Sequence, residues 1–342
     1  MLWFLLSTPY NREIDSLIML SLEFTYRENY GAALSFADEI IKKYPNEPDG
    51  YFFKAAIYDY YMEDYHTDRY SRQFFENMKI AEEKAKAKLL GLNDPTERAW
   101  MYFYIAGAAG YRAIRAGRGG NYVVALKYAI EGLKPLKKAL EEDSTVYDIY
   151  FPLGIYHYAL SKAPRNIGII PTFFLSRNRE EDKEKGINYL RIAWEKGHYT
   201  STVSALTLAW VLSQEGKSRE AIPILKGYVE KYPESRYFKW VYGYLLVKEG
   251  RFKEAEVIYD KLLYLVLRDQ PDSPYNAVYV SYSLGYVKFF LGKFEEALYY
   301  FNVAEQYYEK APPNVKGELS DIIIMVRKMK ERAERRLDEK WK

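Results

Sequence analysis

Three glycines in the second half of the chain are each followed five residues later by an alanine, and this recurrence constrains the fold more than any other feature. The pairs are Gly216 with Ala221, Gly250 with Ala255, and Gly292 with Ala297. The first two glycines are 34 residues apart, and the second and third are 42 apart because the turn-rich stretch RDQPDSPY at 268–275 adds eight residues. Such a period is typical of proteins built by stacking one small structural unit.

Each recurring unit reads as two helices joined by a tight turn. The glycine is expected to end the first helix in a left-handed backbone conformation. The alanine lets the second helix approach the first closely, and large apolar residues follow it at helical spacing, as in Ala297, Phe301 and Ala304. Pro45 and Pro233 are expected to end second helices. The sequence therefore predicts an all-α chain of helix pairs.

The pattern resembles the tetratricopeptide repeat (TPR) family, whose helix pairs are 34 residues long. The resemblance implies one right-handed superhelical domain over residues 1–342, with about seven pairs and a capping helix at 314–342. The repeats are expected at 14–47, 48–94, 95–144, 145–199, 202–235, 236–269 and 278–311. The stretch DIYFPLGIYHYALSKAP also resembles an uncharacterised group of bacterial TPR proteins, whose members often carry export signals.

Composition argues against most kinds of catalytic site. The chain has no Cys, which excludes disulfides, zinc–thiolate sites and thiol nucleophiles. Its three histidines, His66, His157 and His198, have no partner at metal-ligand spacing, and His157 is interpreted as a core residue. Phosphate-binding and nucleophile motifs are also missing from the sequence. We therefore expect no enzyme, no metal and no cofactor.

Aromatic residues make up 17% of the chain, and many fall where the resemblance places a binding groove. In TPR proteins, positions 2, 5, 9 and 12 of each unit point into the concave surface. Such rings offer large, rigid contact areas with polar tips. They could equally pack against neighbouring helices or an inserted segment. The candidate peptide-binding residues are Trp210, Tyr237, Trp240, Tyr244, Tyr279, Tyr282, Tyr286 and Phe289.

An insert at 164–182, PRNIGIIPTFFLSRNREED, interrupts the fourth pair, whose second helix is expected to resume at Lys183. Its apolar middle would be costly in water. It is expected either to fold back into the groove or to mediate self-association or attachment at the cell envelope. The apolar start, MLWFLLSTPYN, is interpreted as a buried helical turn or the remainder of a signal peptide.

Arg112, Arg115 and Arg118 share one helix face and form a candidate site for an acidic ligand. A solvated charged face is the preferred interpretation of these residues. The net charge of +3 does not favour nucleic acid. Chaperone-binding TPR proteins hold the C-terminal carboxylate of a ligand with Lys and Asn on the first helices of adjacent repeats. The corresponding positions here are Ile18, Leu22, Trp240 and Tyr244, which argues against such a site.

Taken together, the sequence predicts a non-enzymatic scaffold that binds a peptide or protein segment in an aromatic-lined groove. The alternative is a self-associating or envelope-attached assembly subunit, with a homo-oligomer possible in either case. No stretch is long and apolar enough for a transmembrane helix. A cytoplasmic and a periplasmic location both stay open. Only 4 Gln among many Lys, Glu and Ile indicate a thermophilic source.

Overall fold

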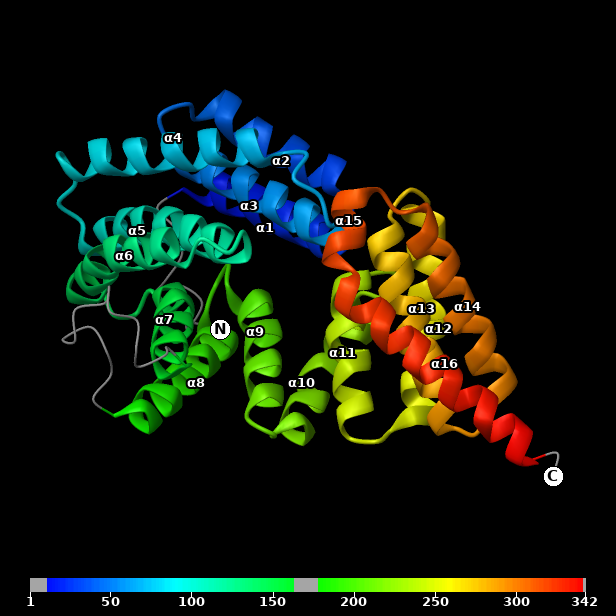
Figure 1. Ribbon diagram of the computed structural model, residues 1–342. Helices are drawn as coiled ribbons and strands as arrows, with labels where there is room; N and C mark the ends of the chain where they lie inside the picture. The colour runs from blue at the N-terminus through cyan, green and yellow to red at the C-terminus, as the bar shows by residue number, and fades with distance from the viewer. Residues whose placement is uncertain (1–10, 163–177, 341–342) are drawn as a thin grey trace. The chain divides into compact units, whose positions relative to one another are not determined.

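The computed structural model describes residues 11–162 and 178–340, and all regular structure in these ranges is helical. Within the two units, consecutive helices pack against each other in pairs, such as α5 with α6 and α13 with α14 (Figure 1). The all-α fold expected from the glycine–alanine recurrence is thus confirmed.

The chain divides into two compact units, and the first consists of residues 1–61 and 69–211. Its helices begin at a favourable capping residue in several cases: the side chains of Asn11, Asn29, Asp94 and Asn121 each accept a hydrogen bond from a first-turn backbone N–H. The helices are α1 (Arg12–Tyr26), α2 (Tyr30–Lys43), α3 (Asp49–Asp64), α4 (Ser71–Leu89), α5 (Pro95–Arg118), α6 (Tyr122–Glu142), the 3₁₀ helix η2 (Tyr147–Ile149), α7 (Tyr150–Lys162), α8 (Arg179–Lys196) and α9 (Ser201–Gln214).

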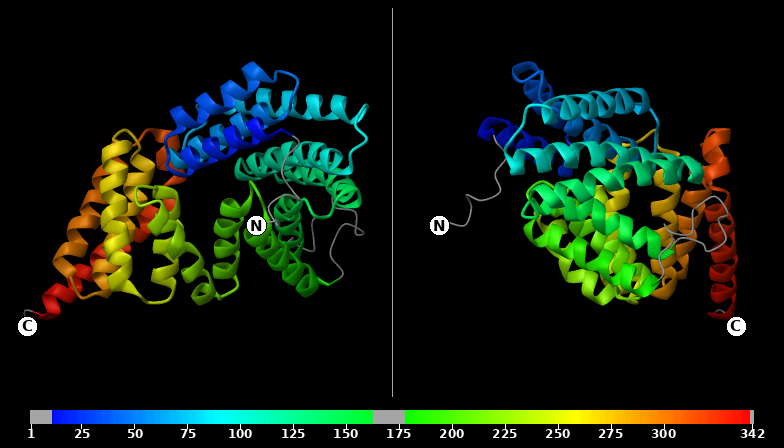
Figure 2. Two further views of the ribbon diagram at one scale, coloured as in Figure 1. Left: turned by 180° about the vertical axis from the view of Figure 1, so that it is seen from behind. Right: turned by 90° about the vertical axis from the view of Figure 1, so that its left-hand side faces the viewer.

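The second unit consists of residues 62–68 and 212–342, so it includes the last residues of α3 and α9. Its helices are α10 (Ser218–Lys231), α11 (Arg236–Lys248), α12 (Phe252–Asp269), α13 (Pro274–Phe290), α14 (Phe294–Lys310), α15 (Pro313–Glu318) and α16 (Ser320–Lys340). The capping segment expected as one helix at 314–342 is therefore two helices, separated at the buried Leu319. Gly317, a weak helix former, lies just before the break. Figure 2 shows α16 lying along α14.

The turn glycines adopt the backbone expected of them. Gly216, Gly250 and Gly292 have φ values of 72°, 67° and 75°, in the left-handed region that other residues avoid. Each lies between the two helices of a pair, at the α9–α10, α11–α12 and α13–α14 turns. The left-handed turn predicted from the sequence is confirmed at all three positions.

A buried carboxylate organises the start of α9 in the first unit. Asp148, 1% exposed, accepts hydrogen bonds from the backbone N–H groups of His198, Tyr199 and Thr200 at 2.9, 2.8 and 2.8 Å. These N–H groups precede or begin a helix and have no intrahelical acceptor. The negative charge of Asp148 also suits the positive end of the helix dipole.

Two segments singled out in the sequence lie largely outside the described residues. The apolar start at 1–10 is one, and residues 163–177 of the insert are the other. The end of the insert is described, and it differs from the expectation. Helix α8 begins at Arg179 rather than Lys183, because the side chain of Asn178 accepts a hydrogen bond from the backbone N–H of Glu181 and caps the helix there.

Candidate peptide-binding face

One side of α13 is a continuous row of aromatic rings. Five residues of this helix that are not buried follow a helical spacing of four, three, four and four: Tyr275, Tyr279, Tyr282, Tyr286 and Phe290. The remaining sides are buried, so packing leaves only this row, Pro274 and Ser283 partly accessible. The rings contact one another along the helix, at 4.8 Å between the centroids of Tyr275 and Tyr279 and 4.7 Å between those of Tyr286 and Phe290.

Helix α11 presents a second, shorter row. Tyr237 and Trp240 are half-buried, and Tyr244 is 38% exposed, while Phe238, Tyr242 and Leu245 on the other side are buried. The spacing of three and four residues places the three outer rings on one face of the helix.

Tyr259 of α12 contacts both α11 and α13. Its buried ring fills the space above Gly243 of α11, where an added Cβ would lie 2.9 Å from the ring. Burial raises the pKa of Tyr259, while a hydrogen bond with Ser283 of α13 opposes that rise and the charge of Tyr244 adds to it. We call the outer residues of α11 and α13 the aromatic face: Tyr237, Trp240, Tyr244, Tyr279, Tyr282, Tyr286 and Phe290.

The structure places two sequence-predicted residues elsewhere. Phe289 is 7% exposed and lies in the core of the second unit, where the guanidinium of Arg332 from α16 is 5.2 Å from its ring centroid. The side of α13 that carries Phe289 faces this core, and the neighbouring Phe290 continues the aromatic row. Trp210 is 48% exposed but belongs to the first unit, where its ring meets that of Tyr158 at 6.2 Å.

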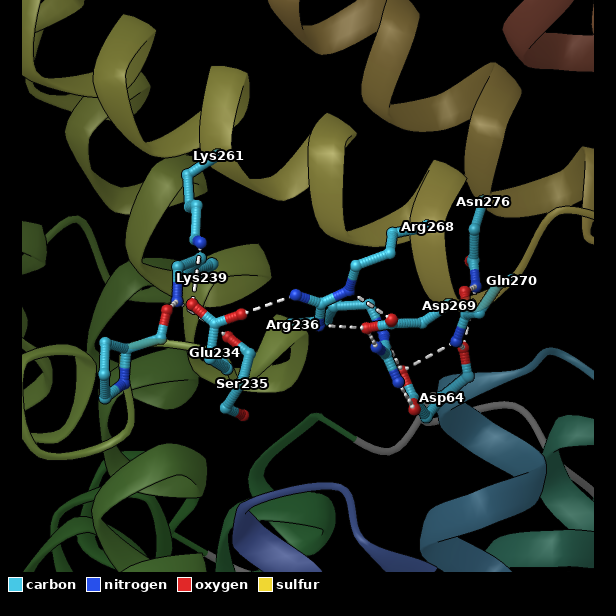
Figure 3. Close-up of polar contacts among 11 residues, drawn as sticks. Asp64, Glu234, Ser235, Arg236, Lys239, Lys261, Arg268, Asp269, Gln270 and Asn276 are labelled. Carbon is cyan, nitrogen blue, oxygen red and sulfur yellow. Dashed lines mark hydrogen bonds and ion pairs between the residues drawn. The ribbon is translucent and has the colours of Figure 1, made fainter.

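A buried polar cluster lies at the N-terminal ends of α11 and α13 (Figure 3). Arg236 donates from Nε to Asp64 at 3.0 Å and from Nη1 to Asp269 at 2.6 Å. Gln270 donates to the backbone oxygen of Asp64 at 2.9 Å, and Asn276 donates to the same oxygen at 2.7 Å. Asp64, Arg236, Gln270 and Asn276 are each at least nine-tenths buried, while the side chain of Asp269 is 25% exposed. The cluster joins the segment 62–68 to α11, α12 and α13 within the second unit.

The segment 62–68 also covers one end of the aromatic row on α13. The imidazole of His66 stacks on the ring of Tyr275 at 3.3 Å and an interplanar angle of 7°, and its Nε2 contacts Glu318. The guanidinium of Arg236 is 5.8 Å from the ring centroid of Tyr65. The part of the row available to a ligand therefore runs from Tyr279 to Phe290.

Tyr282 of the face keeps its hydroxyl proton. Burial raises the pKa of Tyr282, and the nearby Tyr286 adds to the effect, so Tyr282 stays neutral well above physiological pH. A neutral phenol donates one hydrogen bond and accepts others, while its ring offers apolar area. The face can therefore form both apolar contacts and directed hydrogen bonds.

Sequence reasoning missed several of these residues. Tyr275 and Phe290 continue the α13 row by one turn at each end, and Phe252 of α12 stacks on Phe290 at 5.0 Å. Helical spacing counted from Tyr282 would have found Tyr275 and Phe290. Nothing in the sequence connects Asp64 to Arg236, which lie 172 residues apart.

The three candidate arginines of the acidic-ligand site already have carboxylate partners. Arg112 pairs with Glu82, and Arg115 and Arg118 lie 3.6 and 3.7 Å from Asp59. Arg112 and Arg115 line a cavity of about 270 Å³ that Phe75 and Tyr128 also border. An acidic ligand there would have to compete with Glu82 and Asp59.

His157 and His198 each lie beside a carboxylate. His157 is 2.6 Å from Asp182, and His198 is 2.5 Å from Asp15. In residues 11–162 and 178–340, no group of three potential ligands is arranged to hold a metal ion. None of the helices in those ranges combines the length and the apolar character needed to span a membrane.

Comparison with protein-family models matches residues 206–274 to the tetratricopeptide repeat. This range includes most of α9 and all of α10, α11 and α12. This part of the chain is thus similar to the tetratricopeptide repeat family. Members of this family are usually non-enzymatic, and the comparison found no enzyme family. The comparisons do not support a thermophilic source.

Solved structures of similar fold include other repeat proteins. MamA (AMB-1) is 21% identical, with 59% of this chain and 99% of that chain covered and a TM-score of 0.41. YrrB, described as a TPR protein with an unusual peptide-binding site, is 17% identical, with 58% and 84% covered and a TM-score of 0.40. A C-terminal part of a TPR protein from Cytophaga hutchinsonii is 13% identical, with 88% and 99% covered and a TM-score of 0.43. A search of curated proteins gave no match.

Proposed function

We propose that this protein is a non-enzymatic scaffold whose second unit binds an extended peptide or protein segment along the aromatic face. Tetratricopeptide repeats generally serve protein–protein interaction. The observation that carries the proposal is the α13 row, in which the part left open by packing is almost entirely aromatic.

The composition of the face supports a peptide ligand. Tyr and Trp are enriched at the energetic centres of protein interfaces, because their rings bury much area at a small cost in side-chain entropy. Trp240 and Tyr244 of α11 and Tyr282 and Tyr286 of α13 supply such rings from two helices. Their hydroxyl and indole N–H groups can pair with the backbone of an extended ligand.

The experiment that tests the proposal is capture of partners by the immobilised full chain. Wild type is compared with the double variant Trp240→Ala/Tyr244→Ala and with Tyr286→Ala, using both source-cell extract and a displayed library of random linear peptides. The controls are Tyr264→Ala and Tyr299→Ala, which remove tyrosines that are 56% and 62% exposed on the second helices α12 and α14. Circular dichroism confirms that each variant is folded.

We expect wild type and both controls to retain the same peptides and proteins, and the α11 and α13 variants to lose them. Equal retention by the folded face variants would refute the proposal. Loss of binding by Tyr264→Ala or Tyr299→Ala to the same degree would also refute it, because the ligand would then contact the second helices.

A further inference from the structure

A separate pocket lies beside α10 in the second unit. It has a volume of about 490 Å³, within the range of sites that hold a drug-sized ligand or several side chains. One wall is a single face of α10, and the other is the turn between α11 and α12, which runs beside it (Figure 1). The pocket is lined by Arg219, Ile222, Pro223, Lys226, Glu249 and Arg251.

Three cations and one carboxylate line this pocket. Glu249, which is 17% exposed, accepts a hydrogen bond from Nε of Arg219 at 2.8 Å and thereby holds the guanidinium group at the mouth of the pocket. The Arg219 side chain itself is 90% exposed, so its two Nη groups face solvent. The ammonium of Lys226 is 3.8 Å from Glu230, which is beyond hydrogen-bond distance.

The third cation, Arg251, pairs with Glu254 through Nε and Nη2, both at 2.6 Å. Both side chains are about half exposed. Exposed pairs of this kind contribute little to stability, so a ligand carboxylate can replace Glu254 at small cost.

Pro223 contributes an apolar ring to the pocket and leaves one backbone carbonyl of α10 without its usual helical donor. Its ring is exposed beside the buried side chain of Ile222. Proline has no backbone N–H, so the carbonyl oxygen of Arg219, four residues earlier in α10, lacks its usual helical donor. Such an oxygen can accept a hydrogen bond from an amide N–H of a ligand.

We propose that this pocket binds an acidic segment of a protein partner. Two carboxylates of the segment pair with Arg219 and with Lys226 or Arg251, and an aliphatic side chain between them packs on Ile222 and Pro223. A backbone N–H of the segment donates to the carbonyl oxygen of Arg219. The apolar ring and the carbonyl without a helical donor suit a peptide rather than a small inorganic anion, which needs neither.

This site goes beyond the aromatic face, because it uses the second helix α10 and the α11–α12 turn instead of the outer residues of α11 and α13. The proposals for the two sites can therefore be refuted independently of each other. Substitutions at Trp240 and Tyr244 test one, and charge substitutions on α10 test the other.

The test is fluorescence-anisotropy titration of the full chain with two labelled peptides. One has alternating Asp/Glu and Leu residues, and the other has Asn/Gln in place of each acid. The variant is Arg219→Gln/Lys226→Gln/Arg251→Gln. The control is Arg72→Gln/Lys79→Gln, which removes cations that are 85% and 74% exposed on α4. Inorganic phosphate serves as the competitor.

We expect wild type and the control to bind the acidic peptide at least tenfold more tightly than the triple variant does, with an affinity that falls as salt is raised. The neutral peptide should bind at least tenfold more weakly than the acidic one. Equal binding by the triple variant, or equal binding of the two peptides, would overturn the proposal. Displacement of the peptide by phosphate at similar concentration would also overturn it, because the pocket would then be a small-anion site.

Discussion

The guanidinium group of Arg236 and the carboxylate of Asp64 form a two-bond ion pair that is almost completely removed from water. Nε donates to Oδ1 at 3.0 Å, Nη2 contacts Oδ2, and the two side chains are 3% and 1% exposed. The pair holds the end of α3 in the second unit, 172 residues away from α11 in the sequence. Gln270 and Asn276 complete the hydrogen bonding around Asp64, as a buried charge requires.

Removing one partner of this pair should destabilise the protein strongly. Arg236→Ala leaves the carboxylate of Asp64 buried without its cation, and such changes cost about 3–5 kcal/mol. We expect a correspondingly lower urea midpoint, measured by circular dichroism at 222 nm. Arg268→Ala is the control, because Arg268 is 42% exposed in its pairs with Glu234 and Asp269, and its loss should cost about 1 kcal/mol or less.

The double variant Arg236→Met/Asp64→Leu tests whether Arg236→Ala destabilises the protein because the charge of Asp64 stays buried or because packing is lost. It removes both charges and should be more stable than Arg236→Ala, since buried ion pairs can often be replaced by apolar residues at little cost. A double variant as unstable as the single one would contradict this explanation.

The close approach of α13 and α14 should tolerate no side chain at Gly285. A Cβ there would lie 2.7 Å from the buried ring of Phe301, so Gly285→Ala should cost about 1–3 kcal/mol through overpacking. Gly227 of α10 is the matched control, because nothing lies within 4 Å of its added Cβ. Gly227→Ala should stabilise the protein by up to about 1 kcal/mol, since alanine is the better helix former. The measurement is the thermal unfolding midpoint of each variant compared with wild type. A Gly285→Ala variant more stable than wild type would contradict close packing of Phe301 on Gly285.

The features that the sequence predicted correctly are those formed by residues close together in the chain and repeated along it. The recurrence of Gly216, Gly250 and Gly292 predicted both the helix pairs and the left-handed turns, because one glycine conformation is required each time the chain reverses. Helical spacing also placed Tyr282 and Tyr286 on one side of α13. These features depend on residues a few positions apart, and a single sequence displays them directly.

Features that depend on distant residues were not predictable in this way. Phe289 and Phe290 are adjacent and chemically identical, and the packing of α14 and α16 on one side of α13 decides that Phe289 is buried while Phe290 is 44% exposed. The pairing of Asp64 with Arg236 has no local signal either, since any exposed Asp and Arg look the same in a sequence. The family pattern gives positions within a repeat, but not which segment covers a given ring, as His66 covers Tyr275.

The contact between His198 and Asp15 should make the stability of the protein depend on pH. The hydrogen bond to Asp15 raises the pKa of His198 above its usual 6.5. Burial alone would raise the pKa of Asp15, but the hydrogen bonds from His198 and Tyr199 outweigh it and lower that pKa below its usual 3.8. The His198 contribution is therefore complete below pH 6.5 and is lost as the pH rises through its raised pKa. The Asp15 contribution is present above 3.8 and is lost as the pH falls through its lowered pKa.

The measurement is the free energy of unfolding of wild type and His198→Gln, each at about pH 5.5 and about pH 9. A charge-assisted hydrogen bond contributes about 1.5–3 kcal/mol, so we expect wild type to be more stable by roughly that amount at the lower pH. The difference should shrink at the higher pH, where imidazole is neutral in both states. Asp15→Asn should show the same loss of pH dependence. A difference between wild type and His198→Gln that is constant with pH would show that this ion pair does not form.

Alanine substitution of two tyrosines of the aromatic face should distinguish an effect on stability from an effect on peptide binding. Tyr282 is half-buried and its ring centroid lies 6.3 Å from that of the core residue Phe301, so Tyr282→Ala should cost about 1–2 kcal/mol of unfolding free energy as well as binding. Tyr244 is 38% exposed, and Tyr244→Ala should change stability by less than about 0.5 kcal/mol. Urea unfolding gives the first quantity, and retention of a captured peptide gives the second. If Tyr244→Ala left peptide retention unchanged while Tyr282→Ala lost both, the loss would follow from weakened packing, and the ring of Tyr244 would have no part in the binding face.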